Sequence, residues 1–499
     1  MDTLTAYRSH LLEMAKLGSA ISLLGWDQHA HMPKKGVAFR SQVIGKLTKM
    51  MFELSVGDEL GSYLSELESK PDLSEAEAGS VRRIGETYRR RRAVPPEFIE
   101  EQTVARSQAQ SAWAKARADN DFSAFEPHLQ KMVDFARRLA DYYGYEEHPY
   151  DALLRDFEPG MTCAELKTII GPLRDDLVPF LKRLTQDGTK PDASPFRGSF
   201  DLETQRRLAR RALEVIDYDF EAGGLADVPH PFTTTIGQGD VRVTNRYSEE
   251  LLGPGLFAAL HEGGHALYNQ GMQNEGDDLF TLGIAQGASN GIHESQSRMI
   301  ENQLGRSRPF WKHFAPILAE YFPQFADADP ETLYRAANVA EPSLIRVEAD
   351  EVTYNLHIML RFEIETGLMD GSIAVSDLPR LWNEAMERYL GIVPPDDAVG
   401  VMQDVHWSMG AFGYFPSYML GNLYAAQMLT TLREQVPDLD EQIASGDLKP
   451  FLGWLRSNVH KVGGIHEPKE LIERITGETL DASHFVRYVT TKYTDIYKL

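Results

Sequence analysis

The chain has 499 residues, 42% of them hydrophobic, and a formal net charge of −23. This acidic balance provides no basic surface to attract phosphate groups and excludes nucleic acid as an expected partner. The single cysteine, Cys163, excludes an intrachain disulfide, and no apolar stretch approaches the roughly 20 residues of a membrane-spanning helix. The first residues also lack the basic and apolar regions of a signal peptide. The sequence therefore predicts a cytoplasmic protein without a membrane partner.

Apolar residues recur at helical spacing along most of the chain. One such run ends at Gly144, a residue type that commonly stops helices, and begins near Ser123 and Glu126, which have the spacing of a capping box. Short breaks rich in Pro, Gly and Asp separate the runs, so we expect a mainly α protein with a single domain over residues 1–499. The other predicted helices cover residues 5–25, 36–69, 74–92, 97–118, 163–186, 201–216, 309–324, 343–367, 377–390, 415–435, 448–461 and 468–475.

One stretch departs from the helical pattern. Residues 232–236 and 240–244 are rich in β-branched side chains and flank the turn Gly237-Gln238-Gly239, a pattern typical of a β-hairpin. The edge of such a hairpin could hold an extended peptide by backbone hydrogen bonds. A purely structural hairpin is the alternative at this point.

A metal-binding helix is predicted around the motif His261-Glu262-Gly263-Gly264-His265. Histidines four residues apart lie on one face of a helix, and their rings can converge on one Zn²⁺ ion. Glu262 projects to one side of that line, where it can take a proton from water. The two glycines each disfavour a helix by about 1 kcal/mol, which indicates close approach of a neighbouring strand or a substrate backbone. A surface helix with two unrelated histidines is the alternative.

Glu294 is the candidate for the third protein ligand, because a catalytic zinc site takes three protein ligands and leaves a fourth position open. Several glycines between His265 and Glu294 allow the chain to return with a second helix. On that helix Glu294, Ser297, Arg298 and Glu301 recur as a polar stripe. Such a polar stripe usually faces solvent. A second helix with a polar line further along the chain favours the alternative, in which both lines face an active site.

That second polar line lies in the predicted helix 343–367, which is otherwise rich in Leu, Ile, Val and Phe. Arg346, Asp350, Thr353 and His357 recur at i, i+4, i+7 and i+11, which indicates polar groups facing a cavity. Buried charges need partners or a charged ligand. We therefore expect Asp350 to orient Arg346, whose planar fork can bind a carboxylate through two hydrogen bonds. A surface pair of Arg346 with Asp350 is the alternative.

A histidine followed by glycines and tyrosines completes the set of candidates. His406 precedes Tyr414 and Tyr418, and for any one of these tyrosines core packing is the ordinary interpretation. Beside a zinc site, His406 and Tyr414 or Tyr418 become candidate donors to the oxyanion of a tetrahedral intermediate.

Together these residues resemble the Taq-type (thermostable) zinc metallocarboxypeptidases, and the resemblance extends over essentially the whole chain. The segments that carry it are Leu24-Gly25-Trp26-Asp27-Gln28, Tyr150-Asp151-Ala152-Leu153-Leu154, His230-Pro231-Phe232, Asp240-x-Arg242-x-Thr244, His261-Glu262-Gly263-Gly264-His265, Ile292-His293-Glu294-Ser295-Gln296, Ile345-Arg346-x-x-Ala349-Asp350, Gly400-x-x-Gln403-Asp404-x-His406-Trp407 and Leu471-Ile472-Glu473-Arg474-Ile475-Thr476-Gly477.

The resemblance implies a helical body with two lobes flanking a deep central groove, like that of the angiotensin-converting-enzyme and neurolysin group, and a homodimer. It implies one Zn²⁺ per chain, replaceable by Co²⁺, with His261, His265 and Glu294 as ligands and Glu262 as general base. Two departures from the family pattern are visible. The interval between the second histidine and Glu294 is longer, around residues 274–278, and His29-Ala30-His31 stands where the family more often has an acidic residue and a threonine.

The predicted activity is hydrolysis of the last peptide bond of peptides with a free C-terminus, with broad side-chain tolerance. Arg346 is expected to bind the terminal carboxylate, with Arg242, Asp350 and His230 as further substrate-binding candidates. One alternative is an endo-acting zinc oligopeptidase of the same architecture, which would also cleave C-terminally blocked peptides. Another is a catalytically silent peptide-binding relative, against which the intact Glu262 argues, because a pure binding site needs no general base.

Overall fold

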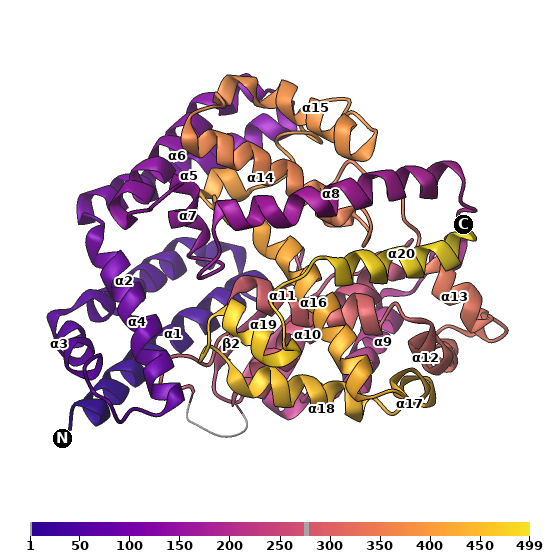
Figure 1. Ribbon diagram of the computed structural model, residues 1–499, viewed down its shortest axis with the longest axis horizontal. Coiled ribbons are helices and arrows are strands. Elements are labelled where there is room, and N and C mark those ends of the chain that lie inside the picture. Colours follow the sequence, from indigo (N-terminus) through magenta and orange to yellow (C-terminus); the bar gives the residue numbers. More distant parts are fainter. Residues whose placement is uncertain (1, 274–278) are drawn as a thin grey trace.

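The protein is mainly helical with one small sheet, as predicted (Figure 1). The computed structural model describes residues 2–273 and 279–499. Up to the sheet, its helices are α1 (Thr3–Ala30), α2 (Val37–Val56), α3 (Asp58–Leu67), α4 (Glu75–Ala93), α5 (Pro96–Asp119), α6 (Phe122–Tyr143), α7 (Pro149–Leu154), α8 (Cys163–Gln186) and α9 (Leu202–Val215).

After the sheet come α10 (Gly253–Gln273), α11 (Asn290–Arg298), α12 (Arg308–Tyr321), α13 (Pro330–Ala336), α14 (Tyr354–Asp370), α15 (Leu378–Leu390), α16 (Pro416–Gln435), α17 (Leu439–Ser445), α18 (Lys449–Asn458), α19 (Pro468–Thr476) and α20 (Ser483–Tyr497). A π-helical segment, Met299–Leu304, continues α11. No helix among the described residues combines the length and apolarity needed to cross a bilayer.

Local sequence signals explain most helices and correct two of their predicted ends. α6 buries its apolar face and stops at Gly144, which has a positive φ of 77°, as predicted. Its N-cap, however, is Asp121, which accepts a hydrogen bond from the backbone of Ala124, so the predicted capping box at Ser123 is wrong. The predicted helix 36–69 is two helices, because Gly57 takes an extended conformation between α2 and α3.

The predicted hairpin is present. Strands β2 (Thr233–Gly237) and β3 (Asp240–Asn245) pair antiparallel, with Thr234 opposite Arg242. The sequence did not indicate a third strand, β1 (Gly223–Asp227), which pairs in parallel with β3. The strand order β1-β3-β2 leaves β2 at an edge, where it contacts α1 and α10.

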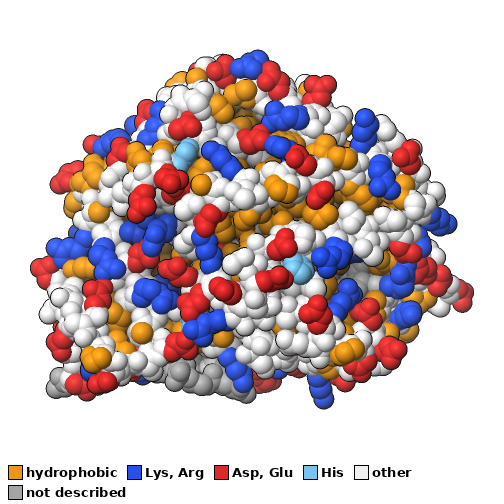
Figure 2. Space-filling view, in the orientation of Figure 1, with side chains coloured by type: hydrophobic (Ala, Val, Ile, Leu, Met, Phe, Trp, Pro, Cys, Tyr) orange, Lys and Arg blue, Asp and Glu red, His pale blue; other side chains and the backbone are white. Residues whose placement is uncertain are grey.

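The site-bearing helices lie together at the centre of the molecule (Figure 1). α10 packs against α9, α11 and β3, and α11 packs against α16. α14 lies among α6, α7, α8 and α15 in the upper part of the view and also contacts α16. The face in view in Figure 2 carries intermixed acidic and basic side chains, with a band of apolar side chains between α8 and α20.

The predicted helix over residues 343–367 starts too early. Only Arg346–Glu348 forms a short 3₁₀ turn, and α14 begins at Tyr354. The reason is Asp350, whose carboxylate accepts hydrogen bonds from the backbone of Val352 and Thr353 and from the backbone of Glu341. Aspartate competes for backbone groups in this way and favours turns over helix interiors. The helical line of polar residues therefore does not exist as predicted.

Candidate active site

Helices α10 and α11 bring the three predicted metal ligands together. The Nε2 atoms of His261 and His265 lie 3.8 and 3.5 Å from Oε2 of Glu294. One donor atom from each of the three residues lies within 4.8 Å of the others. Two histidines and a carboxylate are a donor set of catalytic zinc sites, so these residues fit a single divalent metal ion.

The glycines of the motif allow the close packing that builds this arrangement. A Cβ atom on Gly264 would lie 2.6 Å from the carbonyl oxygen of Gln296 and 2.6 Å from Cα of Ser297, both on α11. A Cβ atom on Gly263 would lie 2.6 Å from Cδ1 of Ile216, just after α9. The predicted close approach is thus real, but the neighbours are side chains and helix backbone of the protein itself and not a strand.

Partly buried partners contact the Nδ1 atom of each ligand-candidate histidine ring. Nδ1 of His261 lies 2.9 Å from the carboxylate of Glu301, which belongs to the π-helical segment after α11. Nδ1 of His265 lies 2.6 Å from Nδ1 of His293, whose Nε2 lies 2.9 Å from the amide oxygen of Asn269. If His293 donates to Asn269 and accepts from His265, both ligand histidines keep Nε2 free for a metal. Such outer partners orient metal ligands.

The same residues determine the charge state of the site. Although burial disfavours a charged ring, the carboxylates of Glu294 and Glu301 raise the pKa of His261. Burial would raise the pKa of Glu294, but Arg298, 2.7 Å away, and the two histidines hold that pKa well below its usual range. Burial lowers the pKa of His293 to about 3, so this ring is neutral at pH 7. Glu294 is therefore anionic, and it lies between the two histidine rings and Arg298.

Glu262 is buried between the metal ligands and the edge strand. The hydroxyl of Thr233, on β2, lies 2.7 Å from Oε2 of Glu262 and 2.9 Å from its carbonyl oxygen. Sequence reasoning missed Thr233, because a threonine in a strand is ordinary. Its position shows why the hairpin precedes the motif: β2 orients the carboxylate of Glu262.

Arg346 is buried in a cluster whose centre is Asp404 and not the predicted Asp350. Nη2 of Arg346 donates to Oδ1 of Asp404 at 2.7 Å, and Nη1 donates to the hydroxyl of Tyr354 at 2.9 Å. Arg361, on α14, donates to Oδ2 of Asp404 through Nη2 at 2.6 Å and Nε at 2.8 Å. The predicted role of Asp350 in orienting Arg346 is therefore wrong. Arg361 was not predicted, although a lone arginine in an apolar helix was a usable signal.

His406, Tyr414 and Tyr418 form an aromatic group beside this cluster. The hydroxyl of Tyr418 lies 3.5 Å from Nε2 of His406, and the rings of Tyr414 and Tyr418 have centroids 5.2 Å apart. Burial lowers the pKa of His406 to about 4, against the opposing charge of Asp404, and burial raises the pKa of both tyrosines. All three groups are thus neutral at pH 7 and can serve as hydrogen-bond donors.

The remaining predicted residues lie around the sheet. Arg242 donates to the carboxylate of Asp240 through Nε at 2.8 Å and through Nη2 at 2.7 Å, and its guanidinium group lies 4.4 Å from the ring centroid of Trp26. His230 is exposed in the loop before β2. The ring of His29 contacts Phe232, the residue before Thr233, so the N-terminal departure from the family pattern lies close to the strand that contacts Glu262. The longer interval, residues 274–278, lies outside the described residues.

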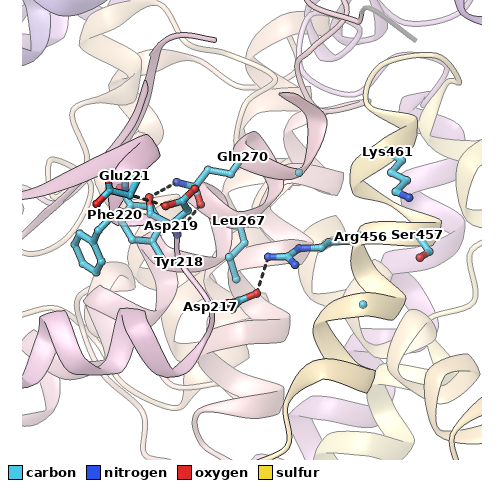
Figure 3. Close-up of a pocket in the computed structure, with 12 residues that line it drawn as sticks. Asp217, Tyr218, Asp219, Phe220, Glu221, Leu267, Gln270, Arg456, Ser457 and Lys461 are labelled. Atoms are coloured by element: carbon cyan, nitrogen blue, oxygen red, sulfur yellow. Dashed lines mark hydrogen bonds and ion pairs between the residues drawn. The ribbon is translucent and has the colours of Figure 1, made fainter. Parts of the chain in front are cut away.

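A separate pocket of about 620 Å³ borders α10 beyond the second histidine (Figure 3). It lies between the segment after α9 and the helix α18, where Arg456 and Asp217 form an ion pair of 2.9 Å. Its described lining includes none of the predicted site residues, and the metal triad is therefore a different place.

The donor set and the neighbouring glutamate place the protein among the HExxH metallopeptidases. The chain belongs to the carboxypeptidase Taq (M32) metallopeptidase family, whose family model matches residues 6–493. It is a metal-dependent carboxypeptidase that acts on peptides.

Relatives support this membership over the whole chain. The chain is 40% identical to carboxypeptidase 1 of Bacillus subtilis over 491 residues, covering 98% of this chain and 97% of the relative. It is 41% identical to thermostable carboxypeptidase 1 of Thermus thermophilus, with 97% of each chain covered. A solved structure of Pyrococcus furiosus carboxypeptidase matches with a TM-score of 0.95 and 39% identity, covering 99% of both chains.

Proposed function

We propose that the protein removes C-terminal residues of broad side-chain type by means of one zinc ion held by His261, His265 and Glu294. The observation that carries this proposal is the convergence of these three donors within 4.8 Å, beside the Glu262 carboxylate that Thr233 orients. Imidazole and carboxylate ligands favour zinc only modestly over neighbouring metals, so Co²⁺ is expected to substitute.

When bound, the zinc ion would polarise the scissile carbonyl and lower the pKa of water towards about 7. Glu262 would take the proton of the attacking water and pass it to the leaving amine, as a general base and then a general acid. His406 with Tyr414 or Tyr418 would donate hydrogen bonds to the oxyanion. Their neutral, protonated states favour this role.

Arg346 would bind the terminal carboxylate and so restrict cleavage to the end of a chain. Its side chain is buried beside Tyr354 and Tyr418. Beyond its pair with Asp404, its guanidinium group has further N–H groups that can donate to a carboxylate. Arg242 remains a second candidate, although Asp240 already occupies one edge of its fork. His230 and the edge strand β2 would contact the substrate further from the cleaved bond.

The experiment compares one N-terminally blocked dipeptide with its C-terminal amide, each with and without a metal chelator. The proposal predicts chelator-sensitive cleavage of the free acid, restored by Zn²⁺ or Co²⁺, and at least a hundredfold slower cleavage of the amide, about 3 kcal/mol of discrimination. Equal cleavage of both would contradict the role of Arg346 and favour an endo-acting oligopeptidase. Cleavage of neither by the metal-loaded protein would favour a silent peptide-binding relative.

Three wider elements of the proposal have their own support. The proposed homodimer rests on the family resemblance, and light scattering should give twice the 56.2 kDa mass of one chain.

The proposed cytoplasmic location is supported by the one cysteine, Cys163, which is buried and unpaired among the described residues. Fractionation of cells tests this location. A single domain with two lobes flanking a groove predicts one cooperative unfolding transition.

A further inference from the structure

Two arginines share one buried aspartate at the place where Arg346 is proposed to bind substrate. We propose that Arg361 is a positioning residue for substrate recognition: it neutralises Asp404, so that Arg346 keeps a positive charge for the terminal carboxylate of the peptide. This inference rests on the proposed role of Arg346, and it assigns the charge balance of the site to a residue that does not touch the substrate.

Asp404 is divided between the two guanidinium groups. Its Oδ1 atom accepts from Nη2 of Arg346 at 2.7 Å, and its Oδ2 atom accepts from Nη2 and Nε of Arg361 at 2.6 and 2.8 Å. The amide oxygen of Gln403 accepts from Nη2 of Arg361 and from the backbone of Arg346, both at 2.9 Å. Each arginine is thus held in place by the same pair of side chains, which fixes their relative position.

The two arginines differ in how many of their N–H groups remain available to a substrate. Arg361 is wholly buried, and its Nη1 donates to the carbonyl oxygen of His357 on its own helix, so it faces the protein on all sides. Arg346 directs Nε and Nη2 to Asp404 and Nη1 to Tyr354. Of its five N–H groups, contacts among the described residues use three. One N–H on each terminal nitrogen remains, and these two groups can donate to a substrate carboxylate.

The charges of the cluster do not cancel. Two guanidinium groups, which stay protonated in proteins, surround one carboxylate, and the excess is one positive charge. The facing groups are the phenols of Tyr354 and Tyr418 and the rings of His357 and His406, all neutral at pH 7. Two further carboxyl groups have partners of their own. Glu365, four residues after Arg361 on α14, accepts hydrogen bonds from Tyr150 and Trp407, and burial raises its pKa to about 7. Glu294 pairs with Arg298. An uncompensated buried charge is costly, and an anionic substrate end removes that cost.

Loss of the charge at Arg361 would therefore act through Arg346. Asp404 would then cancel the charge of Arg346, and the cluster would offer hydrogen bonds to a carboxylate without net attraction. Substrates with a free C-terminus would lose affinity, whereas an amide, which carries no charge there, would lose little. A purely structural role of Arg361 would instead affect both substrates equally.

The test measures kcat and KM for the blocked dipeptide acid and its amide in the metal-loaded wild type and in three variants of Arg361. Arg361→Met and Arg361→Gln remove the charge by different side chains, in case one of them fails to fold, and Arg361→Lys keeps it. Arg137→Met is the matched control, because Arg137 also binds α14, through the carbonyl oxygen of Leu368, but is remote from Asp404.

The neutral variants are expected to raise KM for the acid and to lower the acid-to-amide ratio of kcat/KM at least about tenfold, the size of a weakened charge-assisted hydrogen bond. Arg361→Lys is expected to restore most of the ratio, and Arg137→Met to leave it unchanged. A wild-type ratio in the neutral variants, or an equal loss on both substrates, would overturn the inference alone. A wild type that does not prefer the acid would overturn the role of Arg346 and this inference with it.

Discussion

Thr233 shows how a single hydroxyl group can prepare the proposed general base. Its contact with Oε2 of Glu262, at 2.7 Å, directs a carboxylate that would otherwise rotate among several positions. Thr233→Val is nearly isosteric but removes the donor. We expect kcat to fall about tenfold with little change in KM, as for the loss of one hydrogen bond to a charged group.

Thr233→Ser provides the matched variant, because it keeps the hydroxyl and is expected to retain most of the activity. Thr234→Val, on the opposite face of β2, tests whether any loss comes from the strand. Equal losses in Thr233→Val and Thr234→Val would show that the hydroxyl of Thr233 does not act on Glu262.

The buried ring of His460 is expected to account for a measurable part of the pH dependence of the protein's free energy of unfolding. Burial lowers the pKa of this ring to about 3, whereas an unfolded histidine has a pKa of about 6.5. As the pH falls below 6.5, the unfolded chain binds a proton that the folded ring does not, so stability present above pH 6.5 is lost towards pH 3. The loss from His460 is about 2–3 kcal/mol between pH 7 and 4.5.

His460→Gln tests this contribution, because glutamine can keep the hydrogen bond that Nε2 makes with Gln296 at 3.0 Å. Urea unfolding at pH 7 and pH 4.5 should show a smaller loss of stability in the variant than in the wild type. The exposed His230→Gln should behave as wild type. The same acid loss in His460→Gln would contradict the buried, neutral state of His460.

At the scale of elements, the contact between α10 and α11 determines whether the ligands converge. A methyl group at Gly264 would meet the backbone of α11 at 2.6 Å, and helix backbone cannot yield as a flexible side chain does. Gly264→Ala is expected to destabilise the protein by about 1–3 kcal/mol and to weaken metal binding, because it separates Glu294 from the two histidines.

Gly25→Ala is the control for helix propensity. A Cβ atom at Gly25, inside α1, would meet nothing within 4 Å, so alanine should stabilise the protein by up to about 1 kcal/mol. Thermal midpoints and metal competition titrations measure both effects. A stabilised Gly264→Ala protein with unchanged metal affinity would contradict the proposed close packing.

The elements also show which inferences a sequence can support. The helix that carries the motif around His261, the hairpin and the mainly helical character follow from local spacing and turn residues, and the structure contains all three. The partner of Arg346 could not be inferred from spacing, because residues 343–353 are not α-helical and Asp404 comes from a different part of the chain. Periodicity detects elements, whereas contacts such as Arg361 with Asp404 depend on how elements pack.

At the scale of the whole molecule, a series of side chains joins the metal ligands to the proposed carboxylate site. Glu294 pairs with Arg298, whose guanidinium lies 4.5 Å from the ring centroid of Tyr354. Tyr354 in turn accepts from Arg346, which binds Asp404. α11 supplies Glu294 and Arg298 to this series, and α14 supplies Tyr354. Under the proposed mechanism, the distance that the series sets between the metal and Arg346 would select the last peptide bond.

The most direct test of the account is zinc titration of the metal-free protein, in the wild type and in Glu262→Gln, with binding heat and peptide hydrolysis followed together. We predict one ion per chain with similar affinity in both proteins, and activity that returns in step with binding in the wild type. In Glu262→Gln the restored kcat should be about 10²- to 10⁴-fold lower, the contribution of a general base. Equal activity in the two proteins, or hydrolysis without bound metal, would contradict the account.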